Sequence, residues 1–101
     1  MILEVADFRT PSAEDFEAAM RELAPVIASS AGYLGHTVQR CIETPGRYLL
    51  IVRWASVEAH TKGFRGSPAF ERWRTRLGDH RNGAVVEHFE TVVVNDWPLE
   101  P

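Results

Sequence analysis

The stretch RYLLIVRW, residues 47–54, is apolar on both faces of the strand that it predicts. Alternate side chains of a strand point to opposite sides of the sheet, so the even-numbered residues from Tyr48 to Trp54 share one face. Leu49 and Ile51 occupy the other face, where an antiparallel sheet in contact with water would carry polar residues. We therefore expect a second layer of protein to cover that face.

The residues before this strand predict a strand followed by a helix. Residues 2–9 (ILEVADFR) alternate imperfectly between apolar and polar side chains, which favours a first strand. Thr10 or Ser12 can cap a helix whose first turn holds two acidic residues, which complement the positive end of its dipole. Apolar residues then recur every three or four positions from Phe16 to Ile27, so this helix should bury one stripe against a sheet.

A hairpin is expected next. Gly32 should end the helix, and YLGHTVQRCIE, residues 33–43, predicts the second strand. The Thr-Pro-Gly-Arg sequence at residues 44–47 supplies the fixed and the permissive backbone angles that a tight turn needs. Residues 47–54 should therefore pair back on residues 33–43 in the antiparallel direction.

The remaining residues predict a pair of helices and a last strand. A short helix is expected over residues 56–64, and SPAFERWRTRLG, residues 67–78, has a capping serine, a proline in its first turn and a terminal glycine. The polar connection DHRNG, residues 79–83, leads to AVVEHFETVVV, residues 84–94, which predicts a strand that is apolar on both sides. An irregular tail, residues 95–101, follows.

The order of these elements predicts an α+β fold of the ferredoxin-like, split βαβ type. It would form a four-stranded antiparallel sheet with helices on one face, within a single domain of residues 1–101. The other face would expose Leu49, Ile51 and apolar residues of the last strand, a patch of the kind that marks an interface. We therefore expect a homodimer that packs sheet to sheet, and Trp97 and Leu99 of the tail can pack on the neighbouring chain.

The composition argues against some classes of binding partner and indicates a cellular compartment. The net charge of −3 gives no basic surface of the kind that nucleic-acid-binding proteins need. The single cysteine, Cys41, cannot form a disulfide within the chain, and its place in a predicted strand favours a buried, inert thiol in a reducing compartment. The first ten residues lack the basic segment and the long apolar run of a signal peptide or membrane span. We expect a cytoplasmic protein with neither a nucleic-acid nor a membrane partner.

One long segment resembles a known family. GYLGHTVQRCIETPGRYLLIVRWASVEAHTKGFRGSPAFERWRTRL, residues 32–77, followed by VVEHF at residues 85–89, is similar to the antibiotic biosynthesis monooxygenase family. The features that carry the resemblance are the Gly-Tyr-Leu-Gly opening of the second strand, the strand that ends in Trp54, the Ser-Val-Glu-Ala-His helix start, the Gly-Ser-Pro-Ala-Phe link, and a hydrophobic last strand entered through an acid and a histidine. Together they span most of the chain.

The resemblance implies a dimeric α+β barrel, in which two ferredoxin-like sheets face each other. It also implies a cofactor-independent monooxygenase that acts on an aromatic or quinone-type small molecule, with no cofactor. Two alternatives stay open, because the family also contains haem-degrading monooxygenases and many members without a known activity. They are a haem-degrading monooxygenase and a non-catalytic ligand-binding or dimerisation module of the same fold.

Oxygenation without a cofactor needs an apolar pocket, donors that orient the substrate oxyanion, and a base that works near neutral pH. His60 and Trp54 are the candidate catalytic residues, because His60 lies one turn into the helix after Trp54 and imidazole titrates near pH 7. The aromatic residues would also suit an ordinary packed core. The histidines could equally make structural hydrogen bonds. The candidate substrate-binding residues are Phe64, Trp73, Phe70, His36, Tyr33, Arg74 and His88.

No metal site is expected, because no two histidines stand at a metal-ligand spacing with a third ligand nearby. The resemblance implies that haem-degrading members carry an asparagine on the first strand and a histidine on the last helix. This chain offers Asp7 on the first strand and ERWR, residues 71–74, on that helix, which argues against haem degradation. His80, beside Asp79, is interpreted as a solvated turn residue.

Overall fold

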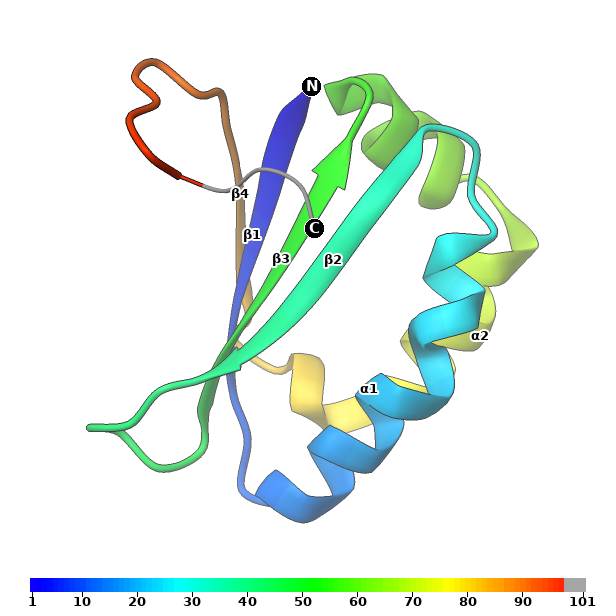
Figure 1. Ribbon diagram of the computed structural model, residues 1–101. Coiled ribbons are helices and arrows are strands. Elements are labelled where there is room, and N and C mark those ends of the chain that lie inside the picture. Colours follow the sequence, from blue (N-terminus) through cyan, green and yellow to red (C-terminus); the bar gives the residue numbers. More distant parts are fainter. Residues whose placement is uncertain (98–101) are drawn as a thin grey trace.

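The computed structural model describes residues 1–97, and its elements follow the predicted order. They are β1 (Ile2–Arg9), α1 (Ala13–Ala28), β2 (Tyr33–Arg40), β3 (Arg47–Trp54), the π-helical turn η1 (Ala59–Phe64), α2 (Pro68–Leu77), the 3-10 helix η2 (Gly78–Arg81) and β4 (Val85–Phe89). The strands form one antiparallel sheet in the order β2-β3-β1-β4. Both α1 and α2 lie on one face of it (Figure 1), so the ferredoxin-like α+β fold is confirmed. Within the described residues, no helix is long and apolar enough to cross a membrane.

The two faces of β3 meet different surroundings. The side chains from Tyr48 to Trp54 on the even-numbered face are each no more than 2% exposed, because they pack under the helices. Helix α1 contributes the apolar stripe that covers them, and its members are Phe16, Ala19, Met20, Leu23, Val26 and Ile27. The predicted division of the RYLLIVRW segment into a core face and a second face is therefore confirmed.

The second face of the sheet, called the open face here, has no helix of residues 1–97 against it (Figure 1) and carries an apolar patch, with Glu87 beside Val5 as a charged neighbour. The strand register sets Val5 beside Ile51 and Leu3 beside Phe89, so its apolar side chains are contiguous. Phe89 is 49% exposed. An ion pair of 2.8 Å between Asp7 and Arg47 borders the patch. The apolar residues of the open face are Leu3, Val5, Leu49, Ile51, Val85 and Phe89.

Strand β2 is shorter than the sequence predicts. It ends at Arg40 instead of residue 43, because the chain turns back before Arg47, whose N–H donates to the Thr44 carbonyl at 3.1 Å. Ile42 is consequently 90% exposed. Cys41 is half-buried beside this turn, so the prediction of a buried strand cysteine was wrong.

Strand β4 also ends early, at Phe89 instead of residue 94. Its partner β1 runs in the opposite direction, and Phe89 already pairs with Leu3 near the start of that strand, so later residues have no strand to pair with. Val92 is 87% exposed as a result. Of the two tail residues that the sequence places against a neighbouring chain, Trp97 is 70% exposed and Leu99 lies outside the described residues.

The connection between α2 and β4 is not the solvated turn that the sequence suggests. His80, in η2, is buried, with its Nδ1 2.5 Å from the Thr10 hydroxyl and its Nε2 2.7 Å from a carboxylate oxygen of Asp15. The interpretation of His80 as a solvated residue was therefore wrong. These two bonds tie the start of α1 to the end of α2, which fixes the two helices over the sheet.

Candidate active site

A cavity of about 140 Å³ lies between the sheet and the segment from η1 to α2. Phe64 and Trp73 meet edge to face in its wall, with ring centroids 5.7 Å apart, and the Arg81 guanidinium lies 5.6 Å from the centre of the Phe70 ring. Three predicted substrate-binding residues, Phe64, Phe70 and Trp73, therefore come together here. The apolar part of the wall consists of Ala6, Phe8, Ile27, Leu50, Phe64, Phe70, Trp73, Ala84 and Val86.

The turn η1 directs His60 into this cavity. The Ser56 hydroxyl accepts the N–H of Ala59 at 3.1 Å at the start of the turn. Gly32 has a φ of +84°, and a Cβ at this position would lie 2.7 Å from the Ala59 Cβ, so a glycine is needed for the chain to pass so close. His60 and Phe64 end up 3% and 2% exposed. Widened helical turns of this type recur at functional sites.

A buried glutamate completes the polar side of the cavity. Glu4 on β1 is 5% exposed, and its Oε1 accepts the indole N–H of Trp54 at 2.9 Å. The Nε2 of His60 lies 3.4 Å from the same oxygen. Burial raises the pKa of Glu4, although the hydrogen bond from Trp54 and the charge of Arg65 lower it in part. This carboxyl therefore holds its proton more tightly than a glutamate in water.

His60 connects Glu4 to a second histidine. Its Nδ1 lies 2.8 Å from the Nε2 of His88, which is half-buried on β4, so one of the two rings donates to the other. The His60 ring stacks on Trp54 with centroids 5.5 Å apart. Burial, with smaller contributions from Arg65 and His88, lowers the pKa of His60 to about 4. A neutral His60 at pH 7 has one N–H and one lone pair, which is what a proton relay between Glu4 and His88 requires.

Glu4 was missed in the sequence, where the only first-strand residue discussed was Asp7, as a departure from the asparagine of haem-degrading members. The strand register explains the error, because positions 4, 6 and 8 of β1 face the helices while Asp7 faces the open face and pairs with Arg47. Glu4 shares its face with Ala6 and Phe8, both buried. A carboxylate at an inward-facing position of an otherwise apolar strand face was the available signal.

Of the other predicted site residues, one supports the cavity from behind and three lie elsewhere. Trp54 is 0% exposed, so it backs the cavity and holds Glu4 instead of presenting its own surface to a ligand. Arg74 is exposed on α2 and pairs with Glu71 at 2.5 Å, so the structure does not bring it to the cavity. Tyr33 and His36 lie together on β2, with the Tyr33 hydroxyl 2.6 Å from the His36 Nδ1.

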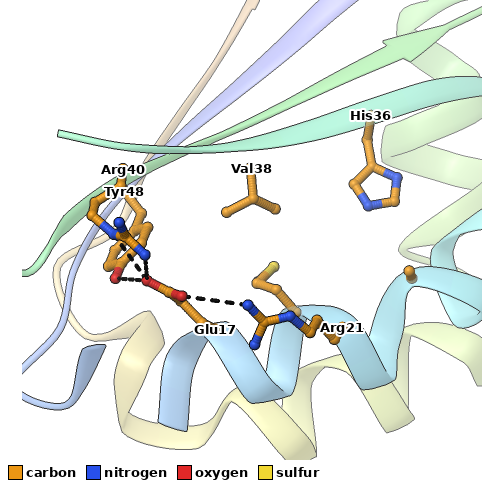
Figure 2. A pocket seen from close by; sticks show the side chains of 8 residues that line it. Glu17, Arg21, His36, Val38, Arg40 and Tyr48 are labelled. Carbon is orange, nitrogen blue, oxygen red and sulfur yellow. Dashed lines mark hydrogen bonds and ion pairs between the residues drawn. The ribbon is translucent and has the colours of Figure 1, made fainter. Parts of the chain in front are cut away.

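His36 faces a second concavity, a groove of about 500 Å³ between α1 and the edge strand β2 (Figure 2). One of its ends holds Glu17, which interacts with Arg40, Arg21 and the Tyr48 hydroxyl. None of the residues that line this groove lines the 140 Å³ cavity. The eight lining residues are Glu17, Met20, Arg21, Ala24, His36, Val38, Arg40 and Tyr48.

A metal centre has no evident ligands in the part of the chain that the structure describes. In residues 1–97, no three His, Cys, Asp or Glu side chains come together in a way that could hold a metal ion. The polar side chains that line the 140 Å³ cavity are Glu4, His60, Arg65 and Arg81, and His88 contacts His60 from behind.

Known proteins resemble this chain in sequence or in structure. A family model described as antibiotic biosynthesis monooxygenase matches residues 1–76. YczJ of Bacillus subtilis is 42% identical over 82 residues, which are 78% of this chain and 84% of YczJ. A crystal structure from Bordetella bronchiseptica, described as an antibiotic biosynthesis monooxygenase, is 32% identical with a TM-score of 0.84 and covers 91% of this chain and 97% of that one. SnoaB of Streptomyces nogalater, a cofactor-independent oxygenase, is 23% identical with a TM-score of 0.72 and covers 96% of both chains.

Proposed function

The chain belongs to the antibiotic biosynthesis monooxygenase family, and we propose that it is a cofactor-independent monooxygenase with its active site in the cavity beside Glu4 and His60. The observation that carries this proposal is the buried chain of Glu4, His60 and His88 at the wall of an aromatic cavity. Buried titratable groups with displaced pKa values are typical of catalytic sites. The description of the structural relative SnoaB as a cofactor-independent oxygenase supports the same reaction class.

The proposed substrate is a small phenol or hydroquinone with a single ring. The cavity volume of about 140 Å³ is close to that of engineered cavities of about 150 Å³, lined by Leu, Ile and Phe, which bind benzene. The ring faces of Phe64, Phe70 and Trp73 would pack against such a substrate. A porphyrin is much larger than this cavity, so the geometry gives no support to the haem-degrading alternative.

The reaction balances without an external reductant. A hydroquinone and O₂ give a hydroxyquinone and water: one oxygen atom replaces a ring hydrogen, and the other leaves as water. All the electrons that reduce O₂ come from the substrate ring. The contribution of the protein is to remove the phenolic proton, because the electron-rich phenolate transfers electrons to oxygen more readily than the phenol does.

Glu4 is the proposed base for that proton. Its raised pKa brings it toward the range in which a base works at neutral pH. Neutral His60 would hold the Glu4 carboxyl in place and pass the proton to His88, through contacts of 3.4 Å and 2.8 Å. His88 is half-buried and would return the proton to solvent. Trp54 keeps the carboxylate aligned through its indole N–H.

Oxygen uptake tests this function. Purified protein mixed with methylhydroquinone should consume O₂ and form a hydroxyquinone, and Glu4→Gln and His60→Gln should each lower kcat/KM about 100-fold or more, the range that general bases contribute. The matched control is Arg72→Gln on the exposed side of α2, which should leave the rate unchanged. Equal rates in all four proteins would reject this active site. Ligand binding without O₂ uptake would favour the non-catalytic module.

We also infer a homodimer that packs open face to open face. The six apolar side chains of that face are contiguous, and at about 25 cal/mol per Å² the burial of a few hundred Å² on each partner gives several kcal/mol toward association. The residue best placed to test the contact is Ile51, which pairs with Val5 on one side and Thr37 on the other, in the middle of the sheet.

Ile51→Lys should convert the dimer to a monomer, because each interface would then bury two ammonium groups where two isoleucine side chains packed. Sedimentation at micromolar concentration should give about 23 kDa for the natural chain, twice the 11.4 kDa of one chain, and a single-chain mass for the variant. Val57→Lys is the control, because Val57 is 37% exposed in the connection between β3 and η1, outside the strands. An 11.4 kDa particle for the natural chain would reject the dimer.

A further inference from the structure

Two facing rows of side chains, one on α1 and one on β2, form the groove between these elements. Glu17, Arg21 and Ala24 follow each other on α1 at spacings of four and three, so they form one row on the helix. His36, Val38 and Arg40 alternate on β2, so they form a facing row on the strand. Figure 2 shows the two rows turned toward each other, with the Tyr48 side chain at the Arg40 end.

One end of the groove is cationic. Glu17 Oε2 accepts the Tyr48 O–H at 2.5 Å and two N–H groups of Arg40 at 3.0 and 2.6 Å, while Glu17 Oε1 lies 3.6 Å from Arg21. Two guanidinium groups thus share one carboxylate, which leaves a net charge of +1 at this end. Each guanidinium has five N–H donors, so both retain donors for a further anion. A planar carboxylate matches the donor geometry of arginine.

The other end carries a neutral hydrogen-bonding group. The Nδ1 of His36 is taken by the Tyr33 hydroxyl at 2.6 Å, and among residues 1–97 no residue bonds its Nε2. Burial lowers the pKa of His36, so the ring is neutral at pH 7. When Tyr33 donates to Nδ1, the ring proton resides on Nε2 and points away from Tyr33. Figure 2 shows this ring on the α1 side of β2, facing the groove.

The centre of the groove is apolar and long. Val38 lies between His36 and Arg40 on the strand, and Met20 and Ala24 of the helix also line the groove. Four residues of a strand span about 13 Å, so a ligand that reaches both ends must be elongated. The groove volume of about 500 Å³ has room for two fused rings, and it is more than three times the volume of about 140 Å³ beside Glu4.

We propose that the α1–β2 groove is a second ligand site, distinct from the proposed active site, for a flat two-ring aromatic acid with a hydroxyl group at its far end. The carboxylate binds between Arg21 and Arg40, the rings lie over Val38, and the hydroxyl oxygen accepts the Nε2–H of His36. The groove therefore selects a ligand with three properties: a negative charge, a flat apolar ring system, and a hydrogen-bond acceptor at the end opposite the charge. An inorganic anion satisfies the first property alone, and a neutral naphthol lacks it.

The probe for this site is 6-hydroxy-2-naphthoate, with amide NMR shifts to locate it and fluorescence titration to measure its Kd. Shifts should cluster on residues 17–24 and 36–40. 2-Naphthol, which lacks the carboxylate, should bind about tenfold or more weakly, as expected when charge-assisted hydrogen bonds are lost. Arg21→Gln should also weaken the naphthoate about tenfold, because it removes half of the cationic end. Val38→Trp should abolish binding by filling the centre of the groove.

Two variants keep the result specific to the groove. Arg72→Gln removes an exposed arginine from α2 and should leave the Kd unchanged, as should His60→Gln in the proposed active site. Circular dichroism should show that Val38→Trp is folded. Arg21→Gln changes an exposed side chain, so weaker binding by that variant cannot be attributed to a disturbed core. Absence of binding, equal affinity for 2-naphthol, or shifts confined to the residues around Glu4 and His60 would each overturn the second site. Since the oxygen-uptake assay does not involve the groove, either proposal can fail without the other.

Discussion

Trp54→Ala should lower the free energy of unfolding by about 3–5 kcal/mol, a large share of the ~5–15 kcal/mol that stabilises a domain of this size. The indole is 0% exposed, stacks on His60 at 5.5 Å and packs against Phe64 at 5.9 Å between ring centroids. Its removal leaves a cavity and also takes away the N–H that Glu4 accepts at 2.9 Å. Urea denaturation followed by far-UV circular dichroism measures the change.

The same substitution at Trp97 is the matched control for Trp54→Ala. Trp97 is 70% exposed, so Trp97→Ala should change the free energy of unfolding by no more than about 0.5 kcal/mol. Trp54→Phe separates the two causes, because it keeps an aromatic ring and removes the indole N–H, with an expected loss of about 1–3 kcal/mol at pH 7. A loss below 1 kcal/mol for Trp54→Ala would contradict its placement in the core.

The segment RYLLIVRW was sufficient to predict the sheet and its two faces because β3 lies inside the sheet. Every second residue of an interior strand has a fixed neighbour on each side, so the pattern of its side chains reports directly on both layers. The ends of β2 and β4 were placed wrongly for the opposite reason. Residues 41–43 and 90–94 have strand-like composition, but whether they pair depends on where the neighbouring strand stops, which is not encoded locally.

The candidate site was predictable in part for a related reason. His60 and Trp54 are near each other in sequence, so a helical turn after a strand already places them together. Glu4 and His88 come from opposite ends of the chain and meet because β1 pairs with β4, which sets Glu4 opposite His88 in the ladder. A contact of this type follows only after the strand order and register are known. The contact of His80 with Thr10 was missed for the same reason, since 70 residues separate the pair.

His60 should make the protein lose stability in acid. Its pKa is about 4 in the folded protein, compared with about 6.5 in the unfolded chain. Between these two pKa values the unfolded chain binds a proton at His60 and the folded protein does not, so lower pH favours unfolding. The contribution of neutral His60 is fully present above pH 6.5 and is lost as pH falls toward 4. One pKa unit is worth about 1.4 kcal/mol, so the loss should reach about 2–4 kcal/mol.

Glu4 opposes this trend, and a comparison of variants separates the two residues. Because the pKa of Glu4 is raised, its contribution is present below the ordinary value of 4.5 and is lost as pH rises through the raised value. Urea denaturation at pH 7.5, 6, 5 and 4.5 should therefore show a steeper acid loss for Glu4→Gln than for the natural chain. His60→Gln should show a flatter profile, or a gain in stability on acidification.

His36→Gln is the control, since that ring is only half-buried and its removal should flatten the profile less. If His60→Gln retained the full acid loss of the natural chain, the acid-sensitive group would have to lie elsewhere in the structure.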